Sequence, residues 1–241
     1  MHTLLIVKTG RTFADLASRR GDFEHWFQTH VAAAAEGAAR FVVIDAQAAP
    51  ELPPAGEYDG VLVTGSPSAV HDREPWSVRA GEWLRRTAEA GTPVLGVCYG
   101  HQLLADSWGG RSGRNPAGRE IGVTEVTLHD PDPLFADLPP SFPVLTTHSD
   151  AVLTAPPHSR VLASNAHTAI QALAYGRRAR TVQWHPEFDA DVIGHYVRTR
   201  APLIDAELGE GTAARLLREV REVPSGPVIF RNFIRYCIRG D

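Results

Sequence analysis

The chain has 241 residues, 43% of them hydrophobic, and its 24 Lys plus Arg against 28 Asp plus Glu give a formal net charge of −4. This balance excludes a globally basic nucleic-acid-binding protein and a polybasic membrane anchor, and the hydrophobic content excludes a disordered chain. Two cysteines cannot build a disulfide framework and fit a reducing compartment. The first ten residues lack the basic and long apolar regions of a signal peptide, and no apolar run approaches the roughly 18 residues of a membrane span. We therefore expect a soluble, cytoplasmic protein.

Short apolar runs alternate with helical patterns in the first part of the chain. The strand candidates are Leu4–Val7, Phe41–Ile44, Gly60–Thr64 and Pro93–Val97. Apolar residues at helical spacing predict helices around residues 23–34 and 76–87, and Gly91 stands where a glycine commonly ends a helix. This alternation indicates a parallel sheet with helices on both faces.

The pattern changes from Ile121 onward. Short strand candidates separated by Pro- and Gly-rich turns follow at Val123–Leu128, Val144–Thr146, Val161–Ser164, Ile170–Ala174 and Thr181–Trp184. No helical pattern separates them, so they predict an antiparallel or mixed extension of the same sheet. Helical patterns return after Asp189, and the last one places Phe230, Phe233, Ile234 and Cys237 on one face, where Cys237 is expected to be inert core. No repeat or low-complexity linker divides the chain, so we expect one α/β domain, 1–241, with a helical insertion at about 189–227.

The strongest local signal is Gly96-Val97-Cys98-Tyr99-Gly100, at the end of an apolar strand and the start of a helix. This is the nucleophile-elbow pattern with sulfur in place of the serine oxygen. The sharp turn crowds the neighbours of the nucleophile, so both flanking positions need glycine. The free N–H groups and partial positive charge of the helix N-terminus favour a thiolate and an oxyanion. The alternative is a buried structural cysteine in a glycine-flanked turn.

A cysteine nucleophile needs a base, and the chain has 11 histidines. His185 stands out because Gln183-Trp184-His185-Pro186-Glu187 follows a buried strand. Residues two apart on an extended chain point the same way, so Glu187 can reach the His185 imidazole, fix its tautomer and stabilise its charged form. The alternative is a surface His–Glu pair at a turn.

A third element, Thr64-Gly65-Ser66-Pro67-Ser68, follows another strand. Such a turn at the carboxyl end of a strand can present backbone N–H groups where ligands of α/β proteins usually bind. The alternative is a turn without a binding role.

Together these motifs resemble those of the class-I (triad) glutamine amidotransferases, which carry Gly-x-Cys-x-Gly-x-Gln and, far downstream, His-Pro-Glu. Here the two motifs are Gly96–Gln102 and His185–Glu187, in the expected order. The resemblance runs from about Gly60 to Phe188, and 232–237 is similar to the closing helix of the family. Gly65-Ser66-Pro67 and Thr147-His148-Ser149-Asp150 look like free-standing homologues of the GMP synthase glutaminase domain. The resemblance implies a flavodoxin-like, single-domain fold with a mixed, mainly parallel sheet flanked by helices.

The resemblance also implies roles for individual residues. Cys98 would attack a γ-carboxamide, His185 would move protons and Glu187 would orient His185. The backbone N–H groups of Ser66 and Tyr99 would form the oxyanion hole. Ser66 replaces a glycine common in larger relatives, which puts in doubt how freely its loop can change conformation.

The same resemblance assigns substrate contacts to Gly65, Gln102, Ser149 and Asp150. An Asp150 carboxylate opposite the α-ammonium group of a glutamyl substrate is chemically sensible. The alternatives are an ordinary polar residue in the first helical turn for Gln102 and a local loop turn for Asp150.

The sequence does not support a metal or nucleotide site. It contains no HExxH, CxxC, EF-hand, Walker A or Gly-x-Gly-x-x-Gly motif in a suitable context, and no pyrophosphatase loop. We expect a cysteine-dependent glutaminase without a cofactor, acting on glutamine or another γ-glutamyl small molecule. A synthetase or another ammonia acceptor is a candidate partner; nucleic acid and membrane are not.

Three other functions remain open at this point. A γ-glutamyl peptidase would use the same triad on an isopeptide bond. A DJ-1-like binding protein would be non-catalytic, but that group takes its carboxylate from elsewhere. An esterase with cysteine at the elbow would leave Gln102 and Asp150 unexplained.

The segment 189–227 contains an apolar helical stripe at Ala213, Leu216, Leu217 and Val220. An amphipathic helix must bury such a stripe. It packs either on its own domain or over the rim of the cleft near His185, or on the surface where a synthetase would dock.

Overall fold

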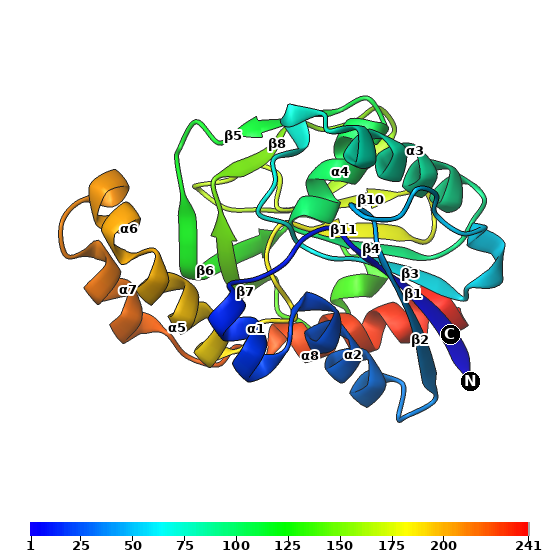
Figure 1. The fold of residues 1–241 in the computed structure, drawn as a ribbon, viewed down its shortest axis with the longest axis horizontal. Coiled ribbons are helices and arrows are strands. Elements are labelled where there is room, and N and C mark those ends of the chain that lie inside the picture. Colours follow the sequence, from blue (N-terminus) through cyan, green and yellow to red (C-terminus); the bar gives the residue numbers. More distant parts are fainter. Residues whose placement is uncertain (241) are drawn as a thin grey trace.

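The computed structural model describes residues 1–240, and their side chains except those of Ala55 and Cys237; the expectation for Cys237 therefore lies outside the described side chains. Eleven strands form within these residues: β1 (His2–Lys8), β2 (Ala39–Asp45), β3 (Gly60–Val63), β4 (Val94–Val97), β5 (Arg111–Arg114), β6 (Glu120–Leu128), β7 (Ser141–His148), β8 (Asp150–Thr154), β9 (Ser159–Ser164), β10 (Ala172–Tyr175) and β11 (Ala179–Val182). Nine of them build one sheet in the order β2-β1-β3-β4-β11-β10-β9-β6-β7, and β5 pairs with β8 beside it (Figure 1).

The sheet is parallel in one half and antiparallel in the other. Strands β2, β1, β3, β4 and β11 run parallel to one another. Strands β10, β9, β6 and β7 continue the sheet in antiparallel pairs. The α/β fold class with a mixed, mainly parallel sheet, predicted from the change of pattern at Ile121, is confirmed.

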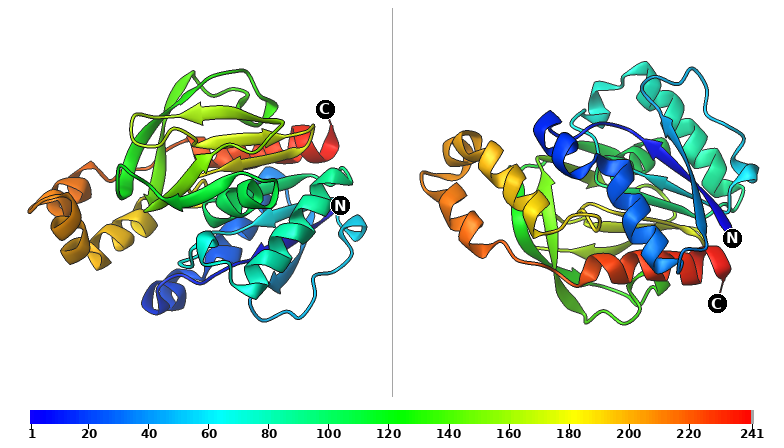
Figure 2. Two further views of the ribbon diagram at one scale, coloured as in Figure 1. Left: turned by 90° about the horizontal axis from the view of Figure 1, so that it is seen from above. Right: turned by 60° about the horizontal axis from the view of Figure 1, so that its bottom comes forward.

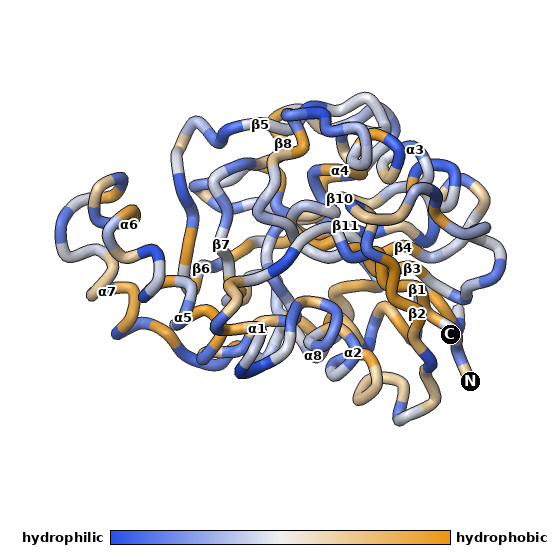
Figure 3. Tube along the Cα trace, viewed as in Figure 1, coloured by the Kyte–Doolittle hydropathy of each residue, from blue (hydrophilic) through white to orange (hydrophobic). Residues whose placement is uncertain are grey.

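Helices cover both faces of the parallel half, which Figure 2 shows from two further directions. Leu4 and Ile6 of β1 belong to the core under α2 (Phe23–Ala34) and α8 (Ser225–Asn232). Leu5 and Val7 belong to the opposite core, under α3 (Pro75–Glu89) and α4 (Tyr99–Ser107). Successive strand residues alternate between the two faces of the sheet, so the side chains of one apolar run pack in two separate cores. Figure 3 shows these apolar residues along the parallel strands.

Helices α5 (Ala190–Thr199), α6 (Ala201–Leu208) and α7 (Thr212–Glu219) lie together beside the antiparallel end (Figure 1). The Asp189 carboxylate caps α5 by accepting a hydrogen bond from the Val192 N–H at 2.8 Å. Ala213 and Leu216 of α7 are buried in a core that also holds Ile121 of β6. The stripe on α7 therefore packs on its own domain.

The sequence did not predict several short elements. They are α1 (Ala14–Arg20), α6 and the pair β5–β8. None of the helices in the described part of the chain has both the length and the apolar character needed to cross a lipid bilayer.

A buried carboxylate connects several strands of the antiparallel half. Glu120 Oε2 accepts hydrogen bonds from His148 Nε2 at 3.0 Å, Thr168 Oγ1 at 3.0 Å and Gln171 Nε2 at 2.9 Å, and Oε1 accepts one from Asn165. Burial opposes ionisation of Glu120, but these donors and the charge of His148 outweigh it and lower the pKa of Glu120 to about 2. The ionised carboxylate is therefore a structural link between β6, β7 and the segment before β10.

We expect Glu120→Gln to lower the free energy of unfolding near neutral pH. A folded-state pKa of about 2 against an ordinary 4.5 contributes roughly 3 kcal/mol above pH 4.5, which is lost as the pH falls through the folded-state pKa. Urea unfolding between pH 7 and pH 3 should show the wild type and variant converging at acid pH. The exposed Glu125 on the same strand supplies a control, and Glu125→Gln should cost far less. A Glu120→Gln deficit that does not depend on pH would contradict the assignment.

Candidate active site

The residues expected to carry chemistry meet at one edge of the sheet. Cys98 directly follows β4, Ser66 follows β3 and His185 follows β11, and these three strands are parallel neighbours. The carboxyl ends of parallel strands meet at the same edge, where open α/β sheets form their ligand crevices. The topology alone therefore brings together three segments that are far apart in the chain.

Cys98 sits in a strained turn at the N-cap of α4, with φ 53° and ψ −99°. A Cβ on Gly96 would lie 2.8 Å from the carbonyl oxygen of Gly100, and one on Gly100 would lie 2.9 Å from Cβ of Val63. Both contacts are too short for any side chain, so the predicted need for glycine on each side of the elbow is confirmed.

The two backbone N–H groups expected to form an oxyanion hole are those of Tyr99, directly after Cys98, and of Ser66, which lines the same cavity as Cys98. Neither the N–H of Tyr99, at the start of α4, nor that of Ser66 donates to an acceptor among the described residues. Gly65 lies close by, since a Cβ there would be 2.9 Å from Cε1 of His185 and 3.7 Å from Cβ of Cys98. The Tyr99 ring is itself fixed, because its hydroxyl lies 2.6 Å from Oγ of Ser77.

Thr9 and Gly10, at the end of β1, hold the loop that carries Ser66. Thr9 Oγ1 donates to the carbonyl of Thr64 at 2.9 Å, and the Thr9 N–H donates to Oγ1 of Thr64 at 3.0 Å. A Cβ on Gly10 would lie 2.6 Å from Oγ of Ser66. The sequence analysis missed both residues. The available signal was their position, because they end a strand next to the one that Gly65 and Ser66 follow.

The His185–Glu187 pair is buried and tightly bonded. His185 Nδ1 lies 2.7 Å from Glu187 Oε1, with side chains 3% and 0% exposed. Burial favours neutral imidazole, but the charges of Glu187 and of a Cys98 thiolate outweigh it and raise the pKa of His185 to about 10. The expected closeness of Glu187 to His185 is confirmed, and the ring is a cation facing the sulfur.

Packing fixes the orientation of this imidazole. The Phe188 ring stacks on it with centroids 4.1 Å apart and an interplanar angle of 16°. On the other side of the motif, Gly226 of α8 packs so closely that a Cβ there would lie 2.1 Å from the carbonyl oxygen of Pro186. Nothing in the sequence indicates the Gly226 contact, because Pro-Ser-Gly-Pro is typical of a loop.

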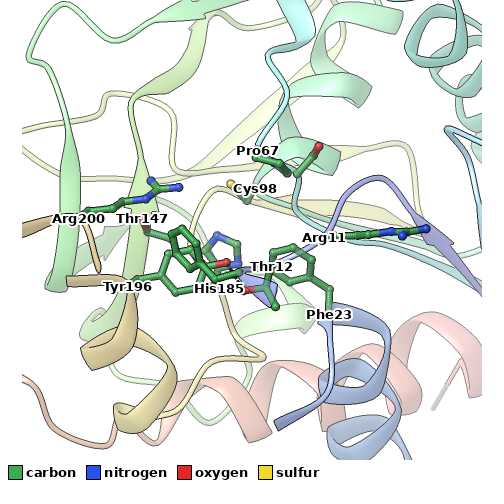
Figure 4. A pocket seen from close by; sticks show the side chains of 11 residues that line it. Arg11, Thr12, Phe23, Pro67, Cys98, Thr147, His185, Tyr196 and Arg200 are labelled. Carbon is green, nitrogen blue, oxygen red and sulfur yellow. Dashed lines mark hydrogen bonds between the residues drawn. The ribbon is translucent and has the colours of Figure 1, made fainter. Parts of the chain in front are cut away.

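A cavity of about 240 Å³ opens in front of Cys98 and His185 (Figure 4). It is lined by Arg11, Thr12, Phe13, Phe23, Ser66, Pro67, Cys98, Thr147, His185, Tyr196 and Arg200. The lining residues 11–13, 147, 196 and 200 were not among the predicted site residues. They come from the loop after β1, from β7, and from α5 and its C-cap, and their meeting at the cavity depends on tertiary packing.

All four predicted substrate contacts lie outside the lining of this cavity. Gly65 is nevertheless close to His185 and Cys98, and its role in binding stays a prediction. Gln102 is buried, and its Nε2 donates to the carbonyl of Asp150 at 2.9 Å and to Oε1 of Gln183 at 3.1 Å. Ser149 Oγ accepts a hydrogen bond from Arg114 at 2.7 Å. Asp150 Oδ2 lies 3.3 Å from Nδ1 of His71. Substrate binding by Gln102, Ser149 and Asp150 stays a prediction.

The histidine next to the elbow is not a second base. His101 is fully buried, with Nδ1 2.8 Å from Oγ1 of Thr181 and Nε2 3.3 Å from the carbonyl of Ile170. Burial lowers the pKa of His101 to about 3, so its ring is neutral. Among the described residues, no three His, Cys, Asp or Glu side chains are grouped as metal ligands would be.

Comparison with known proteins places this geometry in a family. The family model described as glutamine amidotransferase class-I matches residues 25–200. The chain is 42% identical over 128 residues to a GMP synthase (glutamine-hydrolyzing) of Aeropyrum pernix, covering 53% of this chain and 24% of that protein. It is 30% identical over 159 residues to gamma-glutamyl peptidase 3 of Arabidopsis thaliana, covering 64% of each. The chain thus spans about a quarter of the first relative and under two thirds of the second. A glutamine amidotransferase structure from Thermotoga maritima shares the fold, with a TM-score of 0.77, 19% identity and 99% of each chain covered.

We expect Glu187→Gln to lower the pKa of His185 by roughly one pH unit or more, because the carboxylate that stabilises the imidazolium is removed. An NMR titration of the His185 ring in both proteins measures this directly. The exposed Glu210 offers a charge-matched control, and Glu210→Gln should leave the titration in place. An unchanged His185 pKa in Glu187→Gln would remove Glu187 from the triad.

Proposed function

This chain belongs to the class-I glutamine amidotransferase family, and from that premise we propose that it hydrolyses the γ-amide of glutamine or of a related γ-glutamyl compound through a thioester on Cys98. One observation carries the proposal: a buried His185 bonded to Glu187 shares a cavity with a cysteine at a strained strand-to-helix turn. A cation beside the sulfur favours the thiolate, which is the nucleophilic form.

Acylation follows from the positions of these groups. The Cys98 thiolate attacks the γ-carbonyl carbon, and the carbonyl electron pair moves to oxygen. The N–H groups of Ser66 and Tyr99 stabilise the oxyanion without reorganising. His185 then transfers its proton to the leaving nitrogen, the C–N bond breaks, and the γ-glutamyl thioester remains on Cys98 while the amine departs.

Deacylation uses the same groups in reverse. Neutral His185 takes a proton from water as the water oxygen attacks the thioester carbonyl. The same two N–H groups stabilise the second oxyanion. The C–S bond then breaks, glutamate leaves, and the thiolate and imidazolium are restored. Glu187 stabilises the charged ring each time it forms.

We predict that Cys98→Ala abolishes both turnover and acylation, because no other residue supplies the sulfur. His185→Asn should reduce turnover by roughly 10²–10⁴-fold, the usual contribution of a general acid–base group. Intact mass spectrometry after rapid acid quench should show one added glutamyl group on the wild type and none on Cys98→Ala. The matched control is Cys237→Ala, which removes the other cysteine of the chain and should retain activity. Acylation of Cys98→Ala would refute the nucleophile.

A second candidate function is γ-glutamyl peptidase activity on isopeptide bonds. One relative carries that name, and the cavity in front of Cys98 and His185 is larger than ammonia needs as a leaving group. The same triad and the same thioester serve both reactions. Only the amine that departs differs.

A synthetase subunit is a candidate partner, because one relative is a GMP synthase about four times as long as the matched segment. The three side chains and the two N–H groups that the proposed hydrolysis uses nevertheless all belong to this chain. The segment 189–227 contributes through α5, whose Tyr196 lines the cavity, while α7 packs behind it. We therefore propose that hydrolysis does not require a partner.

The purified chain should accordingly turn over glutamine or a γ-glutamyl amide in steady state by itself. Release of glutamate measured with a coupled assay tests this, with Cys98→Ala as the background control. Activity that appears only after a synthetase is added would overturn the proposal and indicate an obligate amidotransferase subunit.

A further inference from the structure

Two arginines line the cavity in front of Cys98, and they differ in what holds them. The Arg11 side chain is 72% exposed and its Nη2 bonds Oδ2 of Asp45 at 2.9 Å. Arg200, at the end of α5, is half-buried, with its guanidinium 5.6 Å from the ring centroid of Phe13 and 5.4 Å from that of Tyr196. Figure 4 shows Arg200 extending along the cavity wall beside Thr147, and Arg11 pointing away on the opposite side. The aromatic rings therefore hold Arg200 in place without neutralising it.

Arg200 has no acidic partner among the residues that the structure describes. The nearby acid, Glu207, already forms an ion pair with Arg119, whose Nε lies 2.7 Å from Glu207 Oε2. Burial and the charge of Arg119 lower the pKa of Arg200. A guanidinium held without a counterion in a cavity favours a bound anion, and its planar fork matches a carboxylate.

A second group in the lining of this cavity also lacks a partner. The Thr147 side chain lines the same cavity, is 8% exposed, and its Oγ1 forms no hydrogen bond to the described residues. A buried hydroxyl without a partner costs free energy that a bound acceptor recovers. Arg200 and Thr147 both line this cavity, on the same side in the view of Figure 4. Together they offer charged and neutral donors to one anionic group.

The position of this anion relative to the scissile bond follows from the chemistry. His185 transfers a proton to the leaving nitrogen, so the leaving group lies on the side of the cavity that His185 lines. The glutamyl head is expected at Ser149 and Asp150, which lie outside this lining. We propose that Arg200, with Thr147, binds a carboxylate carried by the leaving amine, so that the preferred substrates are γ-glutamyl amino acids or peptides. This inference rests on the proposed hydrolysis and names its substrate class.

Two substrates that differ only in this carboxylate provide the test. Ethylamine is alanine without its carboxylate, so γ-glutamyl-alanine and γ-glutamyl-ethylamide share the scissile bond and the acyl group. The ratio of their kcat/KM values should be tenfold or more in the wild type, in keeping with about 1.5–3 kcal/mol for a hydrogen bond to a charged group. Arg200→Met should bring the ratio close to one, and Arg200→Lys should keep part of it. Thr147→Val should reduce it a few-fold.

The ratio of the two kcat/KM values is measured on one preparation of each variant. A lower fraction of folded enzyme reduces both values equally, so it does not change the ratio. Arg11→Met is the matched control, because it removes a cation from the same cavity whose charge is already paired, and the wild-type ratio should persist. An unchanged ratio in Arg200→Met, or an equal fall for both substrates, would overturn the inference. A wild type that hydrolyses both substrates equally refutes the inference alone. A wild type that hydrolyses neither them nor glutamine refutes the proposed function as well.

Discussion

The close approach of residues 96–100 to β3 is the constraint on which the site depends. With glycine at positions 96 and 100, the chain turns within one residue from β4 into α4 and packs against Val63. The turn requires the left-handed φ of 53° at Cys98, a conformation that costs free energy and persists only where surrounding packing enforces it. The two flanking strands supply that packing, because the Cys98 N–H bonds the carbonyl of Val182 in β11 at 2.9 Å. The sulfur and the N–H of Tyr99 are thus positioned by backbone geometry before any side chain contributes.

Two buried acid–imidazole pairs in this fold have different consequences. His148 has acceptors at both ring nitrogens, Glu120 Oε2 at 3.0 Å and the Asp150 carbonyl at 2.9 Å. His185 bonds Glu187 through Nδ1 alone. Its other ring nitrogen, Nε2, is therefore left for Cys98 and a ligand. The first pair can only hold strands together, whereas the second can exchange a proton with a ligand.

The sequence predicted the parts of the site that depend on local geometry. A glycine-flanked cysteine after a strand requires a particular turn, and a His-Pro-Glu segment can bring its outer side chains together in only a few ways. The strands of the sheet were predictable for the same reason, because each apolar run is a local pattern in the sequence. The Phe188 stack, the Gly226 contact with Pro186 and the Thr9 support of the oxyanion loop depend on elements far apart in the chain. Their residues have no distinctive spacing, so periodicity could not find them. The pair β5–β8 was missed because only Ser149 separates β7 from β8.

The residues that local sequence predicts and the residues that tertiary packing places come from different parts of the fold. The groups that we propose to react stand at the carboxyl ends of parallel strands, where the sheet holds them rigidly and where the family motifs reside. Arg200 and Tyr196 instead reach the cavity from α5, beyond the His-Pro-Glu motif, on helices whose core is built from Ile121, Leu145 and Leu216. The two regions are coupled by packing, because Phe188, which stacks on His185, belongs to the same core and its ring centroid lies 5.2 Å from that of Tyr196. In the proposed reaction, strand ends carry the reacting groups and the helices after the His-Pro-Glu motif line the side of the departing amine, so that one thioester mechanism serves amides of different amines.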